Sequence, residues 1–172
     1  GTAYTINGGA AASATNYRTF TSFVSDLVSG ARADGGPVQG PGVSGPVTVT
    51  VAAGSGPYTE QIIIGAIAGV SAANRITIEG NGRTLQHATT AGVNLAILAF
   101  DGASYITVNN LTIASTVGAT NGYGVHFMNA SHHISITNCT INLITSSTSI
   151  GFGGIISSSS RTLASSAATV SG

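Results

Sequence analysis

One nine-residue segment occurs twice in the chain and constrains the fold more than any other feature. Tyr105-Ile-Thr-Val-Asn-Asn-Leu-Thr-Ile113 is followed 28 residues later, counting from 105 to 133, by His133-Ile-Ser-Ile-Thr-Asn-Cys-Thr-Ile141. Ile76-Thr-Ile-Glu-Gly80 begins 30 residues before Ile106, and Pro46-Val-Thr-Val-Thr-Val51 lies about one period earlier. Repetition at this period, with β-branched residues in alternation, is typical of stacked coils of strand.

The repeat predicts an all-β fold, a parallel β-helix of about four to five coils. The coils are expected at residues 47–74, 75–104, 105–132 and 133–160. Arg161 is expected to begin a fifth coil. Each coil should hold the repeated segment and a second apolar strand, predicted in 61–64, 96–100, 125–128 and 154–156.

Stacking at a fixed offset places equivalent side chains above one another. Because strand side chains alternate between faces, one outward row of hydroxyls is predicted. Its expected members are Thr48 or Thr50, then Thr77, Thr107 and Ser135. Asn110 is expected to stack on Asn138 just after the first strand, as an internal ladder that satisfies the backbone groups of a sharp turn. The role of these two asparagines would be structural.

The first part of the chain is different and is predicted to close one end of the stack. Residues 1–45 are assigned to an N-terminal strand, a capping helix and a Gly/Pro linker, and residues 46–172 to coils that continue, or are capped by a partner, beyond 172. Apolar residues fall at helical intervals at Tyr17, Phe20, Phe23, Val24, Leu27 and Val28. Thr15 or Asn16 is expected to cap this helix, and Gly30 to end it.

Composition excludes several classes of function. Charged residues are only 6% of the chain, and five basic and five acidic side chains cancel. No basic patch points to nucleic acid as a partner, and no apolar stretch reaches the roughly 18 residues of a membrane span. The one cysteine, Cys139, excludes an internal disulfide. Low charge with abundant Ser, Thr, Asn and Gly favours an extracellular location.

The pattern of carboxylates argues against catalysis. Calcium binding and acid–base hydrolysis both need acidic residues that lie close together. The acids of this chain are Asp26, Asp34, Glu60, Glu79 and Asp101. Because no two of them share a stack position, we predict that the chain is not an enzyme and has no catalytic residue, cofactor or metal.

A ligand-binding face is the weaker expectation. Of the five tyrosines only Tyr105, with His133 predicted to sit over it, forms a credible exposed pair for stacking on sugars. The outward row of Thr77, Thr107 and Ser135 is a further weak ligand-binding candidate and, as an ordered row of hydroxyls, a candidate surface for ice; the alternative is an ordinary solvated strand face. His132 and His133 are poor joint metal ligands unless the turn brings them together, because neighbouring strand residues face opposite ways. Offset alignment places His126 over Leu98 with Gly154 above it, which predicts a neutral, partly buried histidine.

The motifs Asn109-Asn-Leu-Thr-Ile113 and Thr137-Asn-Cys-Thr-Ile141 at a turn resemble the right-handed parallel β-helix of the pectin-lyase-like superfamily. Four further stretches, together with the segment 66–74, resemble the N-terminal part of large secreted β-helix proteins of Bacteroidetes. They are Tyr17-Arg-Thr-Phe-Thr-Ser-Phe-Val24, Gly45-Pro-Val-Thr-Val-Thr-Val51, Tyr58-Thr-Glu-Gln-Ile-Ile-Ile64 and Arg75-Ile-Thr-Ile78. The resemblance covers roughly residues 4 to 160. It implies an exported, adhesin-like protein at the cell surface and specifies architecture better than activity.

Two classes of function follow as expectations. The first is a non-enzymatic extracellular structural or adhesive segment, which could associate through open β-helix ends into a fibre because unpaired strand edges template pairing. The alternative is a carbohydrate-binding module, or the remnant of a polysaccharide lyase or hydrolase, with a glycan surface around Tyr105. Ice binding is third.

Overall fold

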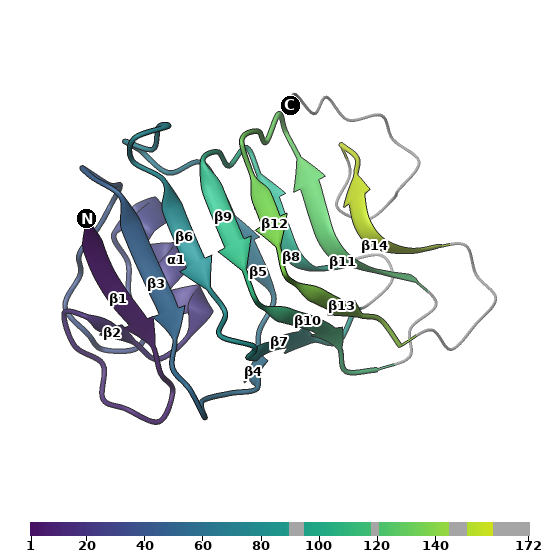
Figure 1. The fold of residues 1–172 in the computed structure, drawn as a ribbon, viewed down its shortest axis with the longest axis horizontal. Helices are drawn as coiled ribbons and strands as arrows, with labels where there is room; N and C mark the ends of the chain where they lie inside the picture. Colours follow the sequence, from purple (N-terminus) through teal and green to yellow (C-terminus); the bar gives the residue numbers. More distant parts are fainter. Residues whose placement is uncertain (90–94, 118–120, 145–150, 160–172) are drawn as a thin grey trace.

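The strands of this protein form a parallel β-solenoid of about three turns, with one short helix near the N-terminus. The computed structural model describes residues 1–89, 95–117, 121–144 and 151–159. Every pair of neighbouring strands is parallel, and each coil passes through three sheets in succession (Figure 1). The predicted coil stack is confirmed for the described residues, and the fifth coil expected at Arg161 lies outside them.

The three sheets each contain four stacked coil strands. The first sheet has the order β12-β9-β6-β3-β1-β2, the second β13-β10-β7-β4 and the third β14-β11-β8-β5. The first sheet consists of β1 (Thr2–Ile6), β2 (Asn16–Tyr17), β3 (Val47–Val51), β6 (Ile76–Glu79), β9 (Ile106–Asn109) and β12 (Ser135–Thr137). The second consists of β4 (Tyr58–Thr59), β7 (Thr84–His87), β10 (Thr112–Ser115) and β13 (Thr140–Asn142). The third consists of β5 (Ile62–Ile64), β8 (Ala96–Asp101), β11 (Asn121–Met128) and β14 (Gly151–Ser157).

The second sheet was not expected, because the sequence indicated two strands in each coil. The repeated nine-residue segment in fact spans two strands and the corner between them. At that corner Asn110 and Asn138 take left-handed backbone conformations, with φ of 52° and 53°, which asparagine tolerates better than most residues. Both side chains are exposed, and Asn138 donates a hydrogen bond of 2.8 Å to Asn109. The predicted internal ladder between the two asparagines is therefore replaced by an external, diagonal contact.

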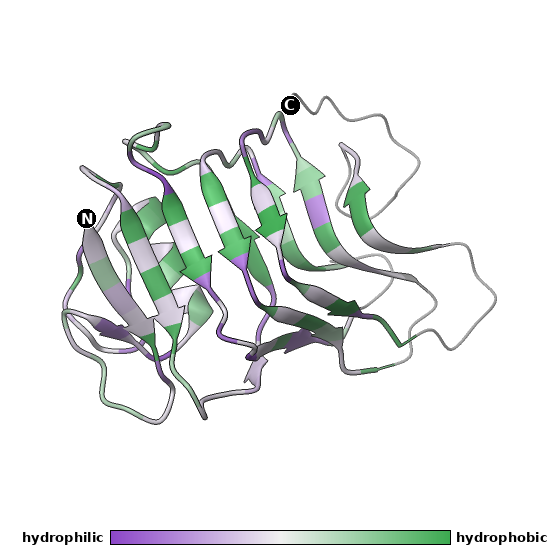
Figure 2. Cartoon of the chain, viewed as in Figure 1, coloured by the Kyte–Doolittle hydropathy of each residue, from purple (hydrophilic) through white to green (hydrophobic). Residues whose placement is uncertain are grey.

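The core lies inside the coils, where one face of each sheet is apolar. Val49, Ile78 and Val108 form one inward column, and β12 continues it with Ile136. Apolar and polar bands alternate along β3, β6 and β9 in Figure 2, as the two-residue period of a strand requires. Phe100 and Phe127 stack between adjacent coils with ring centroids 5.2 Å apart.

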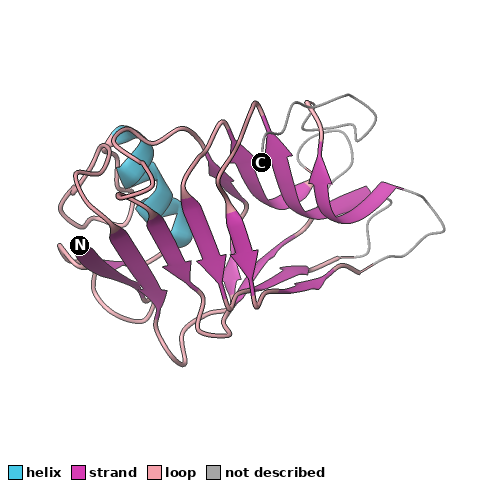
Figure 3. Ribbon diagram, turned by 45° about the horizontal axis from the view of Figure 1, so that its top comes forward, coloured by secondary structure: helices cyan, strands magenta, loops and turns pink. Residues whose placement is uncertain are grey.

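A short helix closes the N-terminal end of the core, as the sequence predicted. Helix α1 (Phe20–Ser29) packs against β5 and contributes Phe20, Phe23 and Leu27 to the main core (Figure 3). Gly30 ends the helix in the left-handed conformation, as predicted, with φ of 68°.

Three details of the helix prediction were wrong. The capping residue is Thr19, whose hydroxyl accepts from the backbone N–H of Ser22 at 3.0 Å. Tyr17 is buried but belongs to β2, and Val28 is 39% exposed. The helix therefore begins one turn later than its apolar pattern indicated. Thr19 is free to accept from an N–H group of the first turn, whereas Asn16 is already hydrogen-bonded to the β1–β2 loop.

The N-terminal strand is part of the solenoid. β1 pairs with β3 along five residues, so the first sheet extends one strand beyond the first coil, and β2 adds a further short strand. Within the described residues, no helix has the length and apolar character needed to cross a membrane.

Candidate functional site

The residues proposed as a ligand surface lie together on the outer face of the first sheet. Thr48, Thr77, Thr107 and Ser135 occupy equivalent positions on four adjacent strands, which confirms the predicted row and selects Thr48 over Thr50. We call these four residues the hydroxyl row. Thr107 accepts a long hydrogen bond of 3.4 Å from Arg75. The other three hydroxyls form no hydrogen bond with any residue that the structure describes, so they remain available to solvent or a ligand.

Arg75, Tyr105 and His133 form a second column beside this row. The rings of Tyr105 and His133 are stacked, with centroids 4.7 Å apart and planes 15° from parallel, which confirms the predicted position of His133. The guanidinium carbon of Arg75 lies 6.0 Å from the Tyr105 centroid, and an Arg75 NH2 group donates to the His133 carbonyl at 3.0 Å. Because His133 covers one face of the tyrosine ring and Arg75 lies close to the ring as well, little of Tyr105 is left for stacking on a sugar.

The turn before β12 brings the two adjacent histidines together. Their ring centroids are 5.0 Å apart. His133 adopts a left-handed conformation, with φ of 53°, so the two residues do not lie in a regular strand and need not face opposite ways. The Nδ1 atom of His132 is 2.9 Å from the carbonyl of Ala130. The part of the chain that the structure describes contains no group of three or more His, Cys, Asp or Glu side chains that could hold a metal ion.

A third outward column links the coils by hydrogen bonds. Asn109 donates to the carboxylate of Glu79, Thr137 donates to Asn109 at 3.0 Å, and Asn138 donates to the same amide oxygen at 2.8 Å. Glu79 also accepts from the backbone N–H of Asn81 at 3.1 Å. These polar groups already satisfy one another between coils, so they stabilise the stack.

All five carboxylates accept hydrogen bonds within the chain. Glu60 accepts from the backbone N–H groups of Phe20 and Thr21 at the start of α1, at 3.1 and 2.8 Å. Asp101 accepts from the amide of Asn129. Asp26 and Asp34 hold the segment between α1 and β3, and Glu79 belongs to the third column. Each acid thus fastens a turn, a helix end or a neighbouring coil.

Several other candidate residues lie in the interior. Tyr17, Tyr58 and Tyr123 are buried, and Tyr4 packs edge-on against Tyr17. His126 is 1% exposed, with Nε2 2.8 Å from the Ser158 hydroxyl.

The predicted register of His126 was wrong. It lies opposite Ala99 and Ile156, where Leu98 and Gly154 were expected. The spacings in this sheet are 27 and 30 residues, from 99 to 126 and from 126 to 156, because the connections between coils vary in length.

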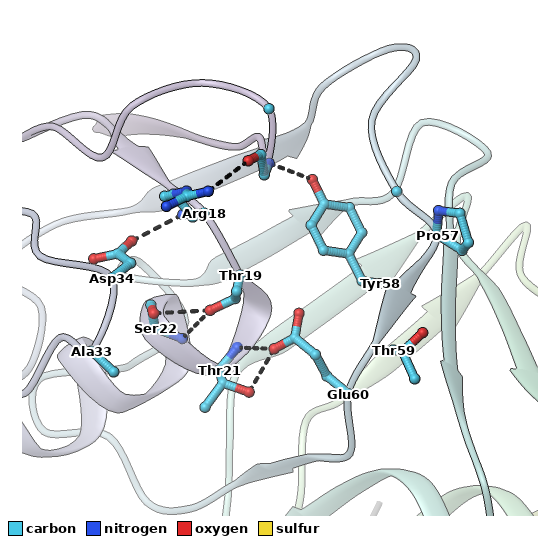
Figure 4. A pocket seen from close by; sticks show the side chains of 13 residues that line it. Arg18, Thr19, Thr21, Ser22, Ala33, Asp34, Pro57, Tyr58, Thr59 and Glu60 are labelled. Atoms are coloured by element: carbon cyan, nitrogen blue, oxygen red, sulfur yellow. Dashed lines mark hydrogen bonds between the residues drawn. The ribbon is translucent and has the colours of Figure 1, made fainter.

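The structure also reveals a cavity that the sequence did not indicate. It is open, has a volume of about 580 Å³ and lies between the β1–β2 loop, the start of α1 and the segment 56–60 (Figure 4). Arg18, Tyr58 and Glu60 all lie on its wall. These residues come from segments about 40 residues apart in sequence and carry no joint motif, so only the fold brings them together.

We expect the Tyr105–His133 contact to stabilise the stack. Tyr105→Ala and His133→Ala should each lower the free energy of unfolding, and a double-mutant cycle should give a coupling of about 0.5–1.5 kcal/mol, the range measured for aromatic pairs. Urea denaturation of the three variants at pH 8 measures this coupling. A coupling within error of zero would show that the stacked rings do not stabilise each other.

No family model matches the sequence, and neither curated proteins nor solved structures give a significant match to it. The parallel solenoid is therefore established by the structure, whereas the likeness to pectin-lyase-like proteins rests on the motifs quoted above. The function therefore has to be inferred from the outer face of the first sheet and from the cavity beside α1.

Proposed function

We propose that this chain is a non-enzymatic, structural or adhesive β-helix segment of an extracellular surface protein. The observation that carries the proposal is that the carboxylates accept hydrogen bonds from the chain itself. All five accept hydrogen bonds that hold a helix end, a loop or the next coil, as described above. An acid–base mechanism needs a carboxylate that can exchange a proton with a substrate, whereas each of these side chains accepts hydrogen bonds from the fold itself.

The hydroxyl row is the proposed contact surface. It is flanked by two columns whose polar groups are bonded between coils, so its own hydroxyls stand in a fixed, regular array. A neutral hydroxyl surface of this kind suits many weak, repeated contacts with another surface and does not depend on charge. The resemblance to right-handed pectin-lyase-like proteins and to Bacteroidetes surface proteins agrees with an exported adhesin.

Self-association would use the end of the solenoid away from α1. At the N-terminal end α1 and the β1–β2 strands cover the core, so head-to-tail stacking into a fibre would have to displace them. Among the described strands, β12, β13 and β14 have a neighbour on one side only, and Ile155 within β14 is 55% exposed. We therefore favour contact between two such ends over an open filament.

Bead adhesion under flow tests the adhesive role. Beads coated with the chain should be retained on polysaccharide- or mucin-coated glass, and the variant Thr77→Glu, Thr107→Glu, Ser135→Glu should reduce retention severalfold. The matched control carries Glu at Thr84, Thr112 and Thr140, an equivalent row on the second sheet. Equal retention of the two triple variants would exclude the hydroxyl row as the contact surface.

An activity assay tests the non-enzymatic part of the proposal. The protein is incubated with polygalacturonate and a panel of neutral polysaccharides, and reducing ends and unsaturated products are measured. No turnover above that of heat-denatured protein is expected. Turnover that Glu60→Gln or Glu79→Gln abolishes would contradict the proposal directly.

A further inference from the structure

The cavity beside α1 has the features of a small-molecule site. Its volume of about 580 Å³ falls within the roughly 300–1,000 Å³ typical of ligand cavities. Its wall is rigid, because the buried Tyr58 hydroxyl accepts from Gly8 N–H at 3.1 Å and donates to the Ile6 carbonyl at 3.2 Å. Figure 4 shows the first of these hydrogen bonds, from the β1–β2 loop to the Tyr58 hydroxyl. The site therefore exists before any ligand binds.

Arg18 supplies hydrogen-bond donors to this cavity. Its side chain is exposed and makes one hydrogen bond, from an NH2 group to the Gly8 carbonyl at 3.3 Å. The other guanidinium N–H groups have no acceptor among the residues that the structure describes. A guanidinium presents its donors in a planar fork, which can contact two neighbouring oxygen atoms at once.

The acceptors on the wall are carboxylates that also accept hydrogen bonds within the chain. Glu60 faces the start of α1, where it also accepts from the Thr21 hydroxyl at 2.6 Å. Asp34 pairs with Arg32 at 2.9 Å. Although burial alone would raise the pKa of Asp34, hydrogen bonds from Arg32 and from the backbone of Arg18 and Gly36 lower it to about 2. Hydrogen bonds thus hold both side chains in place.

The formal charges around the cavity cancel. Of the three charged residues that line the cavity, Arg18 and Glu60 have opposite charges and Asp34 is paired with Arg32, so the cavity has no excess of positive charge to attract an anion. The wall combines donors, acceptors and the apolar surface of Pro57 and Tyr58. A sugar matches this mixture, because each hydroxyl both donates and accepts while the ring presents C–H groups.

From these observations we propose that the cavity between α1 and the segment 56–60 binds a neutral saccharide unit, with two adjacent hydroxyls held by Arg18 and another by Glu60. This site is separate from the hydroxyl row and does not depend on the adhesive function proposed above. It also differs from the glycan surface that the sequence suggested around Tyr105.

The test is an NMR titration of the folded chain with glucose, galactose, mannose and N-acetylglucosamine, and with glucuronate as the charged counterpart of glucose. At least one neutral sugar should give saturable shifts at the Gly8, Gly9 and Thr59 amides, with a dissociation constant on the order of 1 mM. Arg18→Ala should weaken that binding at least tenfold. Arg83→Ala, which removes a guanidinium outside this cavity, should leave it unchanged.

Three outcomes would overturn the proposal. The first is the absence of saturable shifts at these amides with all four neutral sugars. The second is binding that Arg18→Ala leaves intact in a variant whose other amide signals are unchanged, and the third is glucuronate binding at least tenfold tighter than glucose. Tyr105→Ala provides a further comparison, because loss of sugar binding in that variant alone would place the site on the first sheet.

Discussion

Asp26→Ala is expected to lower the free energy of unfolding by about 3–4 kcal/mol, because it leaves three donors without an acceptor at a buried position. The Asp26 side chain is on α1 and is fully buried. Its carboxylate accepts from the Tyr17 hydroxyl at 2.7 Å and from the backbone N–H groups of Gln39 and Gly40, both at 2.9 Å. One residue therefore ties β2, the helix and the Gly/Pro segment together.

The contacts around Asp26 explain why so large a loss is expected. The guanidinium carbon of Arg32 lies 3.9 Å from the centroid of the Tyr17 ring, and Arg32 itself is held by Asp34. Burial, followed by the hydrogen bond to Asp26, raises the pKa of Tyr17 well above its usual value. Removal of the carboxylate thus leaves the Tyr17 hydroxyl and two backbone N–H groups without their acceptor.

Urea denaturation of three variants separates these contributions. Asp26→Asn keeps one acceptor oxygen and should lose less than Asp26→Ala, while Tyr17→Phe removes one donor and should lose about 1 kcal/mol. Glu79→Gln, at a half-buried position on the first sheet, is the control and should change stability by less than about 1 kcal/mol. A loss below about 1 kcal/mol for Asp26→Ala would show that the Gly/Pro segment is held by other contacts.

The coil repeat could be predicted from sequence because the inward and outward positions of the first sheet alternate without interruption. The inward positions of β6 and β9 are β-branched and buried: Ile76, Ile78, Ile106 and Val108. The threonines between them face out. A period of two residues is the strongest signal a strand leaves in a sequence. Residues 106–109 and 135–137 therefore align in the structure as the repeat indicated.

The second sheet could not be predicted in the same way. Its strands are two to four residues long, and only a two-residue corner separates β9 from β10. Such short strands show too few alternations to be told from a turn. The register of His126 failed for a related reason, since a fixed offset cannot follow connections of different length between coils.

The candidate sites show a similar division. The hydroxyl row and the Tyr105–His133 stack follow from the repeat and were predicted. The cavity near Arg18 depends on where α1 docks and on the loop before β4, which no repeat specifies. Its one sequence signal was the change from a strand period to a helical period after Asn16, which indicates a cap but not the cavity that the cap creates.

Gly80→Ala is the second large effect, with an expected loss of about 3 kcal/mol in the free energy of unfolding, at the upper end for overpacking. A Cβ atom at Gly80 would lie 2.5 Å from the Asn110 carbonyl oxygen and 2.6 Å from the Leu111 Cα. Both are backbone atoms of the next coil, which cannot rotate away. The corner between β6 and β7 has four residues, 80–83, whereas the corner between β9 and β10 has only two, 110–111. The shorter corner therefore passes directly over Gly80.

Gly45→Ala provides the matched control for this variant. A Cβ atom at Gly45 would meet no atom within 4 Å, so that substitution should leave stability unchanged or raise it by about 0.4–1 kcal/mol through the unfolded state. Urea denaturation of the two variants, with circular dichroism to confirm the strand content, gives the comparison. If Gly80→Ala were as stable as Gly45→Ala, the corner would have to open at little cost, and coils two and three would not be in the close contact on which the stack depends.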